Sequence, residues 1–255
     1  MTGPRLFDRI DAAQALAELA DIGTNFSDAE VNSVDWHHDD ACIELQEEEE
    51  HGPPVAAGPW WAARRLVAAY EFTDPARIRA VYRADADLEG RDMLLEGRFF
   101  LLRFYIGVRI TEVIDEERAC ERSARPCARG DRVWGWVYET LDGHFERGRM
   151  SYLVIKHQDT GEVEFAIRAF SQAASSMGRL TRLGWVLFGR RTQLRFYRTC
   201  GERLRRAVAA RHGQADLIPP RQNDRGLVLA PSDARRRWFD RLSIRRHQPG
   251  RGVAA

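Results

Sequence analysis

The chain has 255 residues, of which 44% are hydrophobic and 30% charged, and its formal net charge is +1 at pH 7. These values are typical of a globular protein with one good domain and extensions, or with two small domains. The longest apolar run, Phe99–Val108, contains Arg103 and is far shorter than the ~20 residues that span a bilayer, so we expect no transmembrane segment.

Cysteine use and charge distribution suggest where the protein works. No secretory signal is visible, and the four cysteines form no CxxC pair, so we expect a cytoplasmic protein with reduced thiols. Lys156 is the only lysine, which indicates a coding bias towards arginine and weakens arginine clusters as evidence for nucleic acid. Residues 1–58 are acidic and the chain after Gly178 is basic. Either the two ends attract each other across the fold, or the basic end binds an acidic partner.

The first half of the chain mixes helical and strand patterns. The apolar stripe of Arg5–Ile22 predicts a helix, and residues 24–58 lack periodicity and favour a solvated linker. The apolar, alanine-rich Trp60–Tyr70 predicts a second helix. Thr73 or Asp74, followed by Pro75, is a helix start signal for a third helix, which would end near Arg83. Arg91–Asp115 alternates well enough for one or two strands.

Three successive strands followed by a long helix are the strongest pattern in the chain. The expected strands are Val133–Leu141, Arg149–His157 and Glu162–Ser171, joined by turn signals. A helix is expected over about 178–211, with an apolar stripe of Leu180, Leu183, Leu187, Leu194, Tyr197, Leu204 and Val208. Such a meander closes on one amphipathic helix around a core or an internal cavity. We therefore expect Leu187, Leu194 and Tyr197 to be buried, and the Pro- and Arg-rich chain after about 213 to be dispensable for folding.

Several co-linear blocks resemble a domain-of-unknown-function family of bacteria and plants, most closely its longer bacterial branch. They span about residues 59–208 and include YEFTDPARIRAVY, LEGRDMLL, WGWVYETLDGHFERG, GEVEFAIRAFS and RLGWVLFGRRTQLRFYRTCGERL. The resemblance implies a fold similar to lipid-binding START and pollen-allergen proteins. This is the α+β helix-grip, in which a curved antiparallel sheet wraps a long C-terminal helix. The expected organisation is an acidic helix and linker (1–58), a helix-grip-like domain (59–212) and a basic, mostly flexible tail (213–255).

A histidine and a glutamate two residues apart offer one candidate catalytic pair. His144 and Glu146 would project to the same side of an extended segment, and an imidazole beside a carboxylate can act as a general base. Alternatively, Asp142–Gly143 sets a hairpin turn in which His144 caps backbone groups.

An aromatic strand face offers a candidate ligand site. Trp134, Trp136 and Tyr138 recur with period two and form either packed core or the wall of a ligand cavity. Thr140 and Arg168 lie on expected neighbouring strands, and the guanidinium could hold an anionic group.

Metal and cofactor sites are not expected. His37, His38, Asp39 and Asp40 carry possible ligand atoms, but nothing in the sequence fixes partners for them. Cys120 and Cys127 flank a loop without a zinc spacing, and Cys200 is expected in the core.

Three functions remain open on the sequence alone. The first is binding of a small apolar or amphipathic ligand between sheet and helix. The second is a cyclase- or hydrolase-like enzyme that uses His144 and Glu146. The third is a scaffold whose arginine-rich surface meets an acidic partner. The oligomeric state is not predicted.

Overall fold

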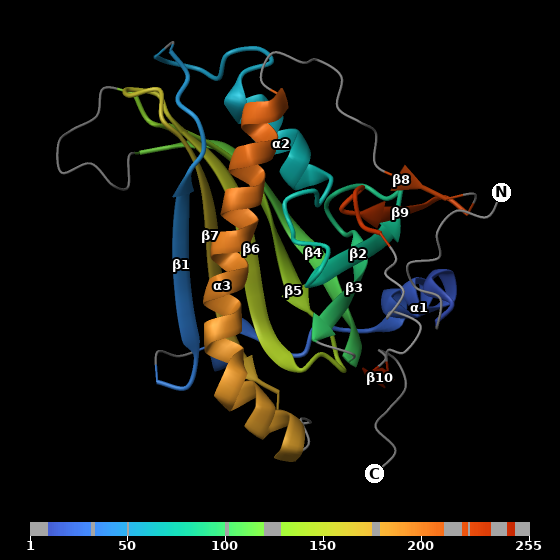
Figure 1. Cartoon of the computed structure of the whole chain (residues 1–255). Coiled ribbons are helices and arrows are strands. Elements are labelled where there is room, and N and C mark those ends of the chain that lie inside the picture. Colours follow the sequence, from blue (N-terminus) through green and yellow to red (C-terminus); the bar gives the residue numbers. More distant parts are fainter. Residues whose placement is uncertain are drawn as a thin grey trace.

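A computed structural model describes residues 10–31, 34–49, 51–99, 102–119, 129–174, 179–211, 221–223, 225–235 and 244–247. The backbone alone is described for Phe99, Leu102, 179–192, Arg211, Arg221 and 244–247. In these residues ten strands form one curved sheet in the order β1-β7-β6-β5-β4-β3-β2-β9-β8, with β10 beside β4 (Figure 1). All pairs are antiparallel except β10 with β4. The strands are β1 (His37–Glu44), β2 (Ile78–Arg83), β3 (Asp92–Phe99), β4 (Leu102–Arg118), β5 (Asp131–Thr140), β6 (Glu146–His157), β7 (Val163–Ala173), β8 (Arg221–Gln222), β9 (Leu227–Ala230) and β10 (Ile244–His247).

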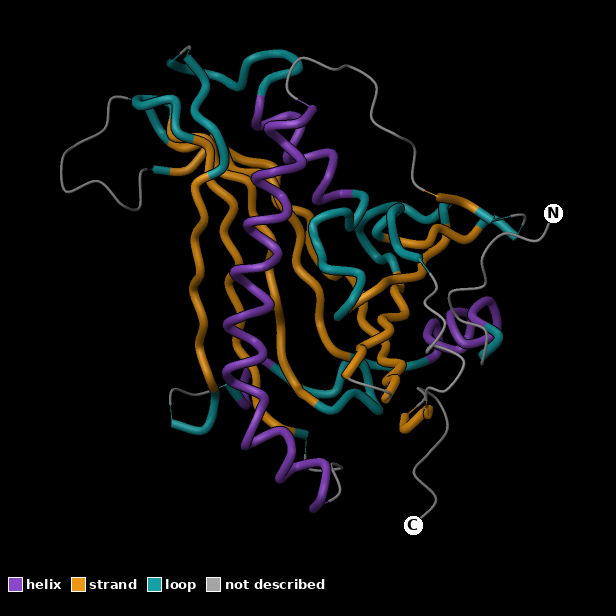
Figure 2. Tube along the Cα trace, in the orientation of Figure 1, coloured by secondary structure: helices purple, strands orange, loops and turns teal. Residues whose placement is uncertain are grey.

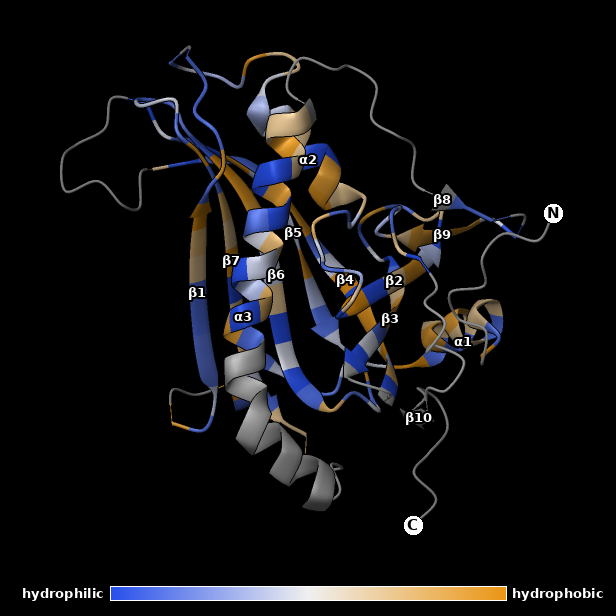
Figure 3. Cartoon of the chain, in the orientation of Figure 1, coloured by the Kyte–Doolittle hydropathy of each residue, from blue (hydrophilic) through white to orange (hydrophobic). Residues whose placement is uncertain are grey.

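Two of the three α-helices cover one face of the sheet, which we call the inner face. The helix α3 (Arg179–Arg211) runs along it, and α2 (Pro59–Ala68) crosses it near the C-terminal end of α3 (Figure 2). The third helix, α1 (Ala12–Glu18), packs on the outer face over β2 and β3. Short 3-10 turns at Leu19–Asp21 and Asp28–Glu30 complete the described helical residues. Polar and apolar residues are mixed along β2, β3 and the coloured turns of α3 (Figure 3). The arrangement is an α+β helix-grip, which confirms the fold class, the three-strand meander and the long helix expected from the sequence.

The expected linker at 24–58 is wrong in its middle. His37–Glu44 forms β1, which pairs with β7 over all eight residues. The segment that follows is also fixed, because the buried Glu48 carboxylate accepts hydrogen bonds from the Lys156 ammonium at 2.6 Å and from the Trp60 amide at 3.1 Å. Pairing with a neighbouring strand and a buried ion pair thus order residues whose own sequence has no apolar period.

The expected helix from Asp74 to Arg83 is also wrong. The Asp74 side chain accepts a hydrogen bond from the Ala76 amide at 2.9 Å, and the backbone carbonyl of Asp74 accepts one from the Ile78 amide at 2.9 Å. The helix start signal therefore makes a single turn, after which Ile78–Arg83 continues as β2. Ala80 and Val81 are completely buried in this strand, and burial of both faces favours a strand over a helix here.

The expected flexible tail contributes three strands to the sheet, β8, β9 and β10. β9 pairs with β2 in the register Ala80↔Ala230 to Arg83↔Leu227, and Leu227, Val228 and Ala230 are buried. The predicted dispensability of this region therefore conflicts with its packing. Because β1 and β9 belong to the same sheet, the three expected segments form one structural unit.

One burial prediction for α3 is right and one is wrong. Tyr197 is 1% exposed and shares the buried side of α3 with Cys200, Leu204 and Val208, whereas Leu194 is 49% exposed. The Tyr197 hydroxyl reaches Asp39, near the start of β1, and the earlier turns of α3 extend past that end of the sheet (Figure 1). Leu194 therefore belongs to the apolar stripe of the sequence but not to the buried side of α3. The side chain of Leu187 lies outside the described residues.

Candidate functional site

Three tyrosine hydroxyls gather between the sheet and the two covering helices. Tyr138 comes from β5, Tyr152 from β6 and Tyr70 from the residue just beyond α2. The register pairs Trp136 with Tyr152 and Tyr138 with Met150, so these side chains all point to the inner face. We call Tyr70, Tyr138 and Tyr152 the tyrosine cluster.

Tyr70 holds its place in the cluster through an unusual helix end. Its φ is +59°, and its amide donates to Val67 at 3.1 Å while the Glu71 amide donates to Leu66 at 2.9 Å. This is a Schellman ending, in which glycine is the usual residue because a Cβ is strained at positive φ. The tyrosine keeps the strain and places its ring inside the protein, where it contacts Trp136 at 6.1 Å between centroids.

Burial keeps all three hydroxyls protonated. Loss of hydration raises the pKa of Tyr70 and of Tyr152 well above the usual value, and it raises the pKa of Tyr138 as well. The Tyr152 hydroxyl lowers the pKa of Tyr70 and of Tyr138 and so offsets part of the rise that burial causes. This effect requires the three hydroxyls to lie close together. The cluster therefore offers neutral O–H groups that can donate and accept hydrogen bonds.

The Tyr152 hydroxyl is the polar atom that this arrangement leaves unsatisfied. Tyr152 is 0% exposed, and its hydroxyl lies near those of Tyr70 and Tyr138 but makes no hydrogen bond of good geometry with them or with any other described residue. The Tyr138 hydroxyl donates to a weak acceptor, the Met150 sulfur, at 3.5 Å. An unsatisfied buried hydroxyl costs free energy, which a hydrogen-bonding partner would recover.

Further polar groups approach the tyrosine cluster from α3 and β1. The Tyr197 hydroxyl donates to the Asp39 carboxylate at 3.1 Å. Loss of hydration, followed by the negative charge of Asp39, raises the pKa of Tyr197, and the Glu146 carboxylate adds to this rise. Burial likewise raises the pKa of the Cys200 thiol, which is 0% exposed as expected.

Aromatic rings form the apolar surroundings of the tyrosine cluster. Phe72 lies 4.6 Å from Tyr152 and 5.4 Å from Phe165 between ring centroids, and Trp136 lies 4.8 Å from Tyr152. The Trp136 indole also donates to the Val67 carbonyl at 3.2 Å, so its role in packing is clear. Because the three tyrosines are also buried, a ligand would reach their hydroxyls only if the packing between sheet and helices opened.

The structure separates the sequence-predicted ligand residues. Tyr138 belongs to the tyrosine cluster and Trp136 lies beside it, whereas Trp134 lies under α2, with the Arg64 guanidinium 5.1 Å from its ring. The Thr140 hydroxyl accepts the Gly148 amide at 2.9 Å and ties the end of β5 to β6. Arg168 lies on the outer face with its Nε 3.7 Å from the Asp40 carboxylate, so it does not share a site with Trp136.

The candidate catalytic pair has the geometry of a hairpin turn. His144 is 8% exposed, and its Nδ1 accepts the Glu146 amide at 2.9 Å, while its own amide donates to Leu141 at 3.0 Å. Gly143 supplies the positive φ of +86°. The imidazole thus contacts the backbone of Glu146, in the capping role that was the alternative on sequence.

The histidine and acidic residues of β1 point to different sides of the sheet. Asp39 faces Tyr197 on the inner face, while the His38 ring lies 6.1 Å from Phe170 on the outer face. Within the described ranges, no group of three His, Cys, Asp or Glu residues could hold a metal ion. Cys120 and Cys127 lie outside the described residues.

The outer surface of α3 is rich in arginine. Arg195, Arg198, Arg205 and Arg206 are exposed, with Glu202 among them. These residues form the described part of the basic surface to which the scaffold hypothesis refers.

Sequence reasoning missed Tyr70 and Tyr152. Tyr152 lies opposite Trp136 in the observed register, but a two-residue turn at Asp142–Gly143 would place it opposite Val133 on the other face, so the turn signal did not reveal it. Tyr70 carries no signal of its own, because a tyrosine at a helix C-terminal position is not expected at positive φ.

Fold and site together define a helix-grip protein with a neutral polar cluster in its interior. The chain belongs to the family described as "Domain of unknown function (DUF1990)", whose model matches residues 20–203. No curated protein matches the sequence significantly. In the described residues, no helix is long and apolar enough to cross a membrane.

Three solved structures show distant similarity to this chain. Ara h 8.0201 has 10% identity and a TM-score of 0.38, and the match covers 69% of this chain and 99% of that one. Ginseng major latex-like protein 151 from Panax ginseng has 9% identity and a TM-score of 0.38, with 70% and 99% covered. The protein of unknown function SA2116 from Staphylococcus aureus has 10% identity and a TM-score of 0.34, with 70% and 98% covered. At these identities and TM-scores, the similarities carry no inference about a ligand.

Proposed function

We propose that the protein binds a small, mostly apolar ligand between the inner face of the sheet and α3. The observation that carries this proposal is the Tyr152 hydroxyl, which is fully buried and lacks a hydrogen bond of good geometry among the described residues. A ligand oxygen at this hydroxyl would remove the cost of leaving it unsatisfied. The aromatic rings around it would contact the apolar body of the ligand.

The chemistry of the tyrosine cluster favours a neutral ligand. Its three hydroxyls stay protonated, since burial raises the pKa of each of them. Neutral donors suit a carbonyl, ether or hydroxyl oxygen, whereas a buried carboxylate would also need a compensating charge. The expected ligand class is therefore an apolar molecule that carries one neutral oxygen function.

A fluorescence titration tests this proposal. Nile red, a neutral apolar dye with a carbonyl group, is added to the wild-type chain and to Tyr152→Phe. The substitution should weaken binding about 3- to 10-fold, the value of one neutral hydrogen bond. Hexadecan-2-one should displace the dye at lower concentration than palmitate does.

Protein stability separates a ligand-binding hydroxyl from a structural one. Tyr152→Phe should leave the free energy of unfolding unchanged or raise it, because it removes an unsatisfied buried group. Tyr82→Phe is the matched control: its hydroxyl donates to Ala69 at 3.2 Å, so this variant should lose stability and keep dye affinity. Equal dye affinity of the wild type and Tyr152→Phe, or no saturable binding by the wild type, would contradict the proposal.

A further inference from the structure

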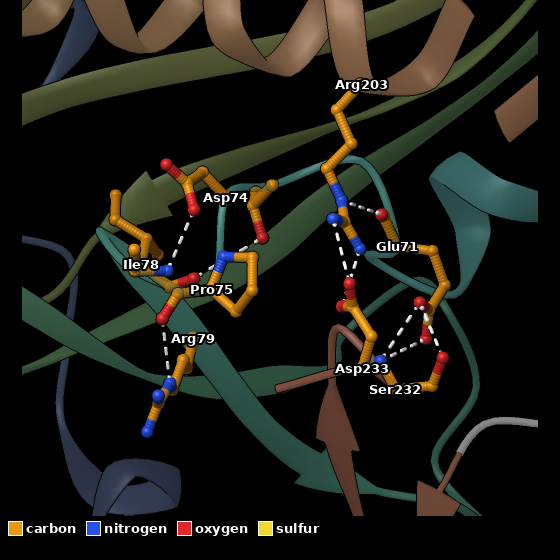
Figure 4. A network of polar contacts seen from close by, with 10 residues as sticks. Glu71, Asp74, Pro75, Ile78, Arg79, Arg203, Ser232 and Asp233 are labelled. Carbon is orange, nitrogen blue, oxygen red and sulfur yellow. Dashed lines mark hydrogen bonds and ion pairs between the residues drawn. The ribbon is translucent and has the colours of Figure 1, made fainter. Parts of the chain in front are cut away.

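A short C-terminal segment meets α3 and the end of α2 at one place. We define residues 225–235 as the clasp; they include β9 and the turn that follows it. The close-up in Figure 4 shows Ser232 and Asp233 of the clasp facing Glu71 and Arg203. The family match ends at residue 203, so the clasp lies outside the matched region.

The first contact joins the clasp to Glu71. This carboxylate is 9% exposed and accepts hydrogen bonds from the Ser232 amide at 2.9 Å and from the Ser232 hydroxyl at 3.0 Å. Hydrogen bonds to an ionised acceptor are about twice as strong as neutral ones. Glu71 is thus held through its side chain by a segment 161 residues away in sequence.

The second contact joins the clasp to α3. Both terminal nitrogens of Arg203 donate to the Asp233 carboxylate, at 3.0 and 2.6 Å. The Nε of the same guanidinium donates to the Glu71 carbonyl at 3.0 Å. One planar side chain on α3 therefore holds the clasp and the end of α2 in a fixed relative position.

The third contact anchors the clasp to the sheet. Leu227, Val228 and Ala230 of β9 are buried against β2, and Ala234 beyond them is 1% exposed. The Arg79 guanidinium donates to the Arg235 carbonyl at 2.7 Å. The clasp therefore leaves the sheet only if buried apolar surface is exposed.

These contacts hold the residue next to Tyr70 of the tyrosine cluster. Glu71 follows Tyr70, whose φ of +59° is strained for a residue with a side chain. Strained backbone persists where surrounding contacts hold it. Here the side chain and the carbonyl of Glu71 are held, by the clasp and by Arg203, immediately next to the strained residue.

We propose that the clasp is a conformational latch that holds Tyr70 and α3 in the closed form and controls access to the interior. This inference rests on the proposed ligand site. Tyr70, Tyr152 and Tyr197 are at most 1% exposed between the sheet and these helices, so entry requires movement of α2 or α3. Arg203 and Glu71 are the points at which the clasp restrains these two helices.

Hydrogen exchange of the full chain, followed by mass spectrometry, tests the latch without any ligand. Asp233→Asn removes the charged partner of Arg203 with little change in shape. Amides of residues 66–73 and of the last turns of α3 should exchange about tenfold faster, as expected for the loss of one charge-assisted hydrogen bond. Exchange in β5–β7 should not change.

The control is Asp85→Asn, which removes an exposed ion pair with Arg83 at 2.8 Å, just after β2. It should leave exchange at residues 66–73 unchanged. If Asp233→Asn accelerates exchange only within residues 221–235, the latch proposal is wrong. Ser232→Ala provides a second variant with the same expectation, should Asp233→Asn fold poorly.

Nile red kinetics separate failure of the latch from failure of the ligand site. In Asp233→Asn the association and dissociation rates should both rise about tenfold, with little change in affinity. Faster exchange with unchanged dye rates would overturn the control of access. Absence of dye binding by the wild type would overturn the ligand site, and exchange at residues 66–73 would still decide whether the clasp restrains the helices.

Discussion

At the scale of single residues, two leucines of α3 differ in their burial. Leu204 is completely buried between helix and sheet, whereas Leu194 is 49% exposed. Leu204→Ala should lower the free energy of unfolding by about 2–5 kcal/mol because it leaves a cavity. Leu194→Ala should change it by less than about 0.5 kcal/mol. Urea unfolding of both variants measures the difference, and equal losses would contradict the placement of α3.

His157 should make stability depend on pH. Its ring lies on the outer face, 3.3 Å from the Glu164 carboxylate and 2.8 Å from that of Asp131. The hydrogen bond to Glu164 is the largest cause that raises the pKa of His157, and the hydrogen bond to Asp131 adds to it. Burial acts in the opposite direction, and the net result is a rise in pKa from 6.5 to about 9. Because the folded pKa is the higher one, the stabilisation is fully present below about pH 6.5 and is lost as the pH rises through about 9.

The variant His157→Gln tests this dependence. The free energy of unfolding of the wild type should exceed that of His157→Gln most near pH 6.5. This difference between the two proteins should shrink as the pH approaches 10. NMR titration of the ring gives the pKa directly. A difference that stays constant from pH 6.5 to 10, or a ring pKa near 6.5, would show that the two carboxylates do not hold a charged imidazole.

At the scale of elements, local pattern predicted some strands well and missed others for a clear reason. β5–β7 carry their own alternation and turn residues, and α3 carries an apolar stripe, so each was predicted from neighbouring residues alone. β1 reads HHDDACIE and has no apolar alternation, so only its pairing with β7 makes it a strand. At β2, the local signal of Asp74 conflicts with the burial of Ala80 and Val81, and tertiary packing decides.

β9 leads to a prediction opposite to the one made from composition. A chain that ends at Gly213 lacks the strand whose Leu227, Val228 and Ala230 are buried against β2. It also leaves Glu71 and Arg203 without Ser232 and Asp233. The truncated chain should unfold at a clearly lower temperature than the full chain, because apolar surface and a buried carboxylate become exposed. Calorimetry of both chains measures this, and equal melting temperatures would show that β9 adds nothing to the fold.

The candidate site was predictable only in part, and the limit is again physical. Period two in β5 identified the aromatic face with Trp136 and Tyr138, and register then brings Tyr152 beside them. The contribution of Tyr70 depends on a strained helix end held by the distant clasp, which no local pattern encodes. Arg168 was grouped with the aromatic face although its place in the alternation of β7 puts it on the other side of the sheet.

At the scale of the whole molecule, one curved sheet holds two layers of different character. The outer face carries α1 with its own apolar cluster and the ion pairs around His157. The inner face carries the aromatic rings, the tyrosine cluster and α3. Since the clasp joins the sheet edge to α3 and the end of α2, the proposed binding function should depend on all three of these parts together.

Native mass spectrometry of the full chain, purified gently from its own source, tests the central claim most directly. The account predicts a stoichiometric extra mass that disappears under denaturing conditions and belongs to a neutral, oxygen-bearing apolar molecule. The same preparation of Tyr152→Phe should retain less of it. A bare polypeptide mass for the wild type, together with no saturable binding of Nile red, would contradict the account and leave the tyrosine cluster as part of the core.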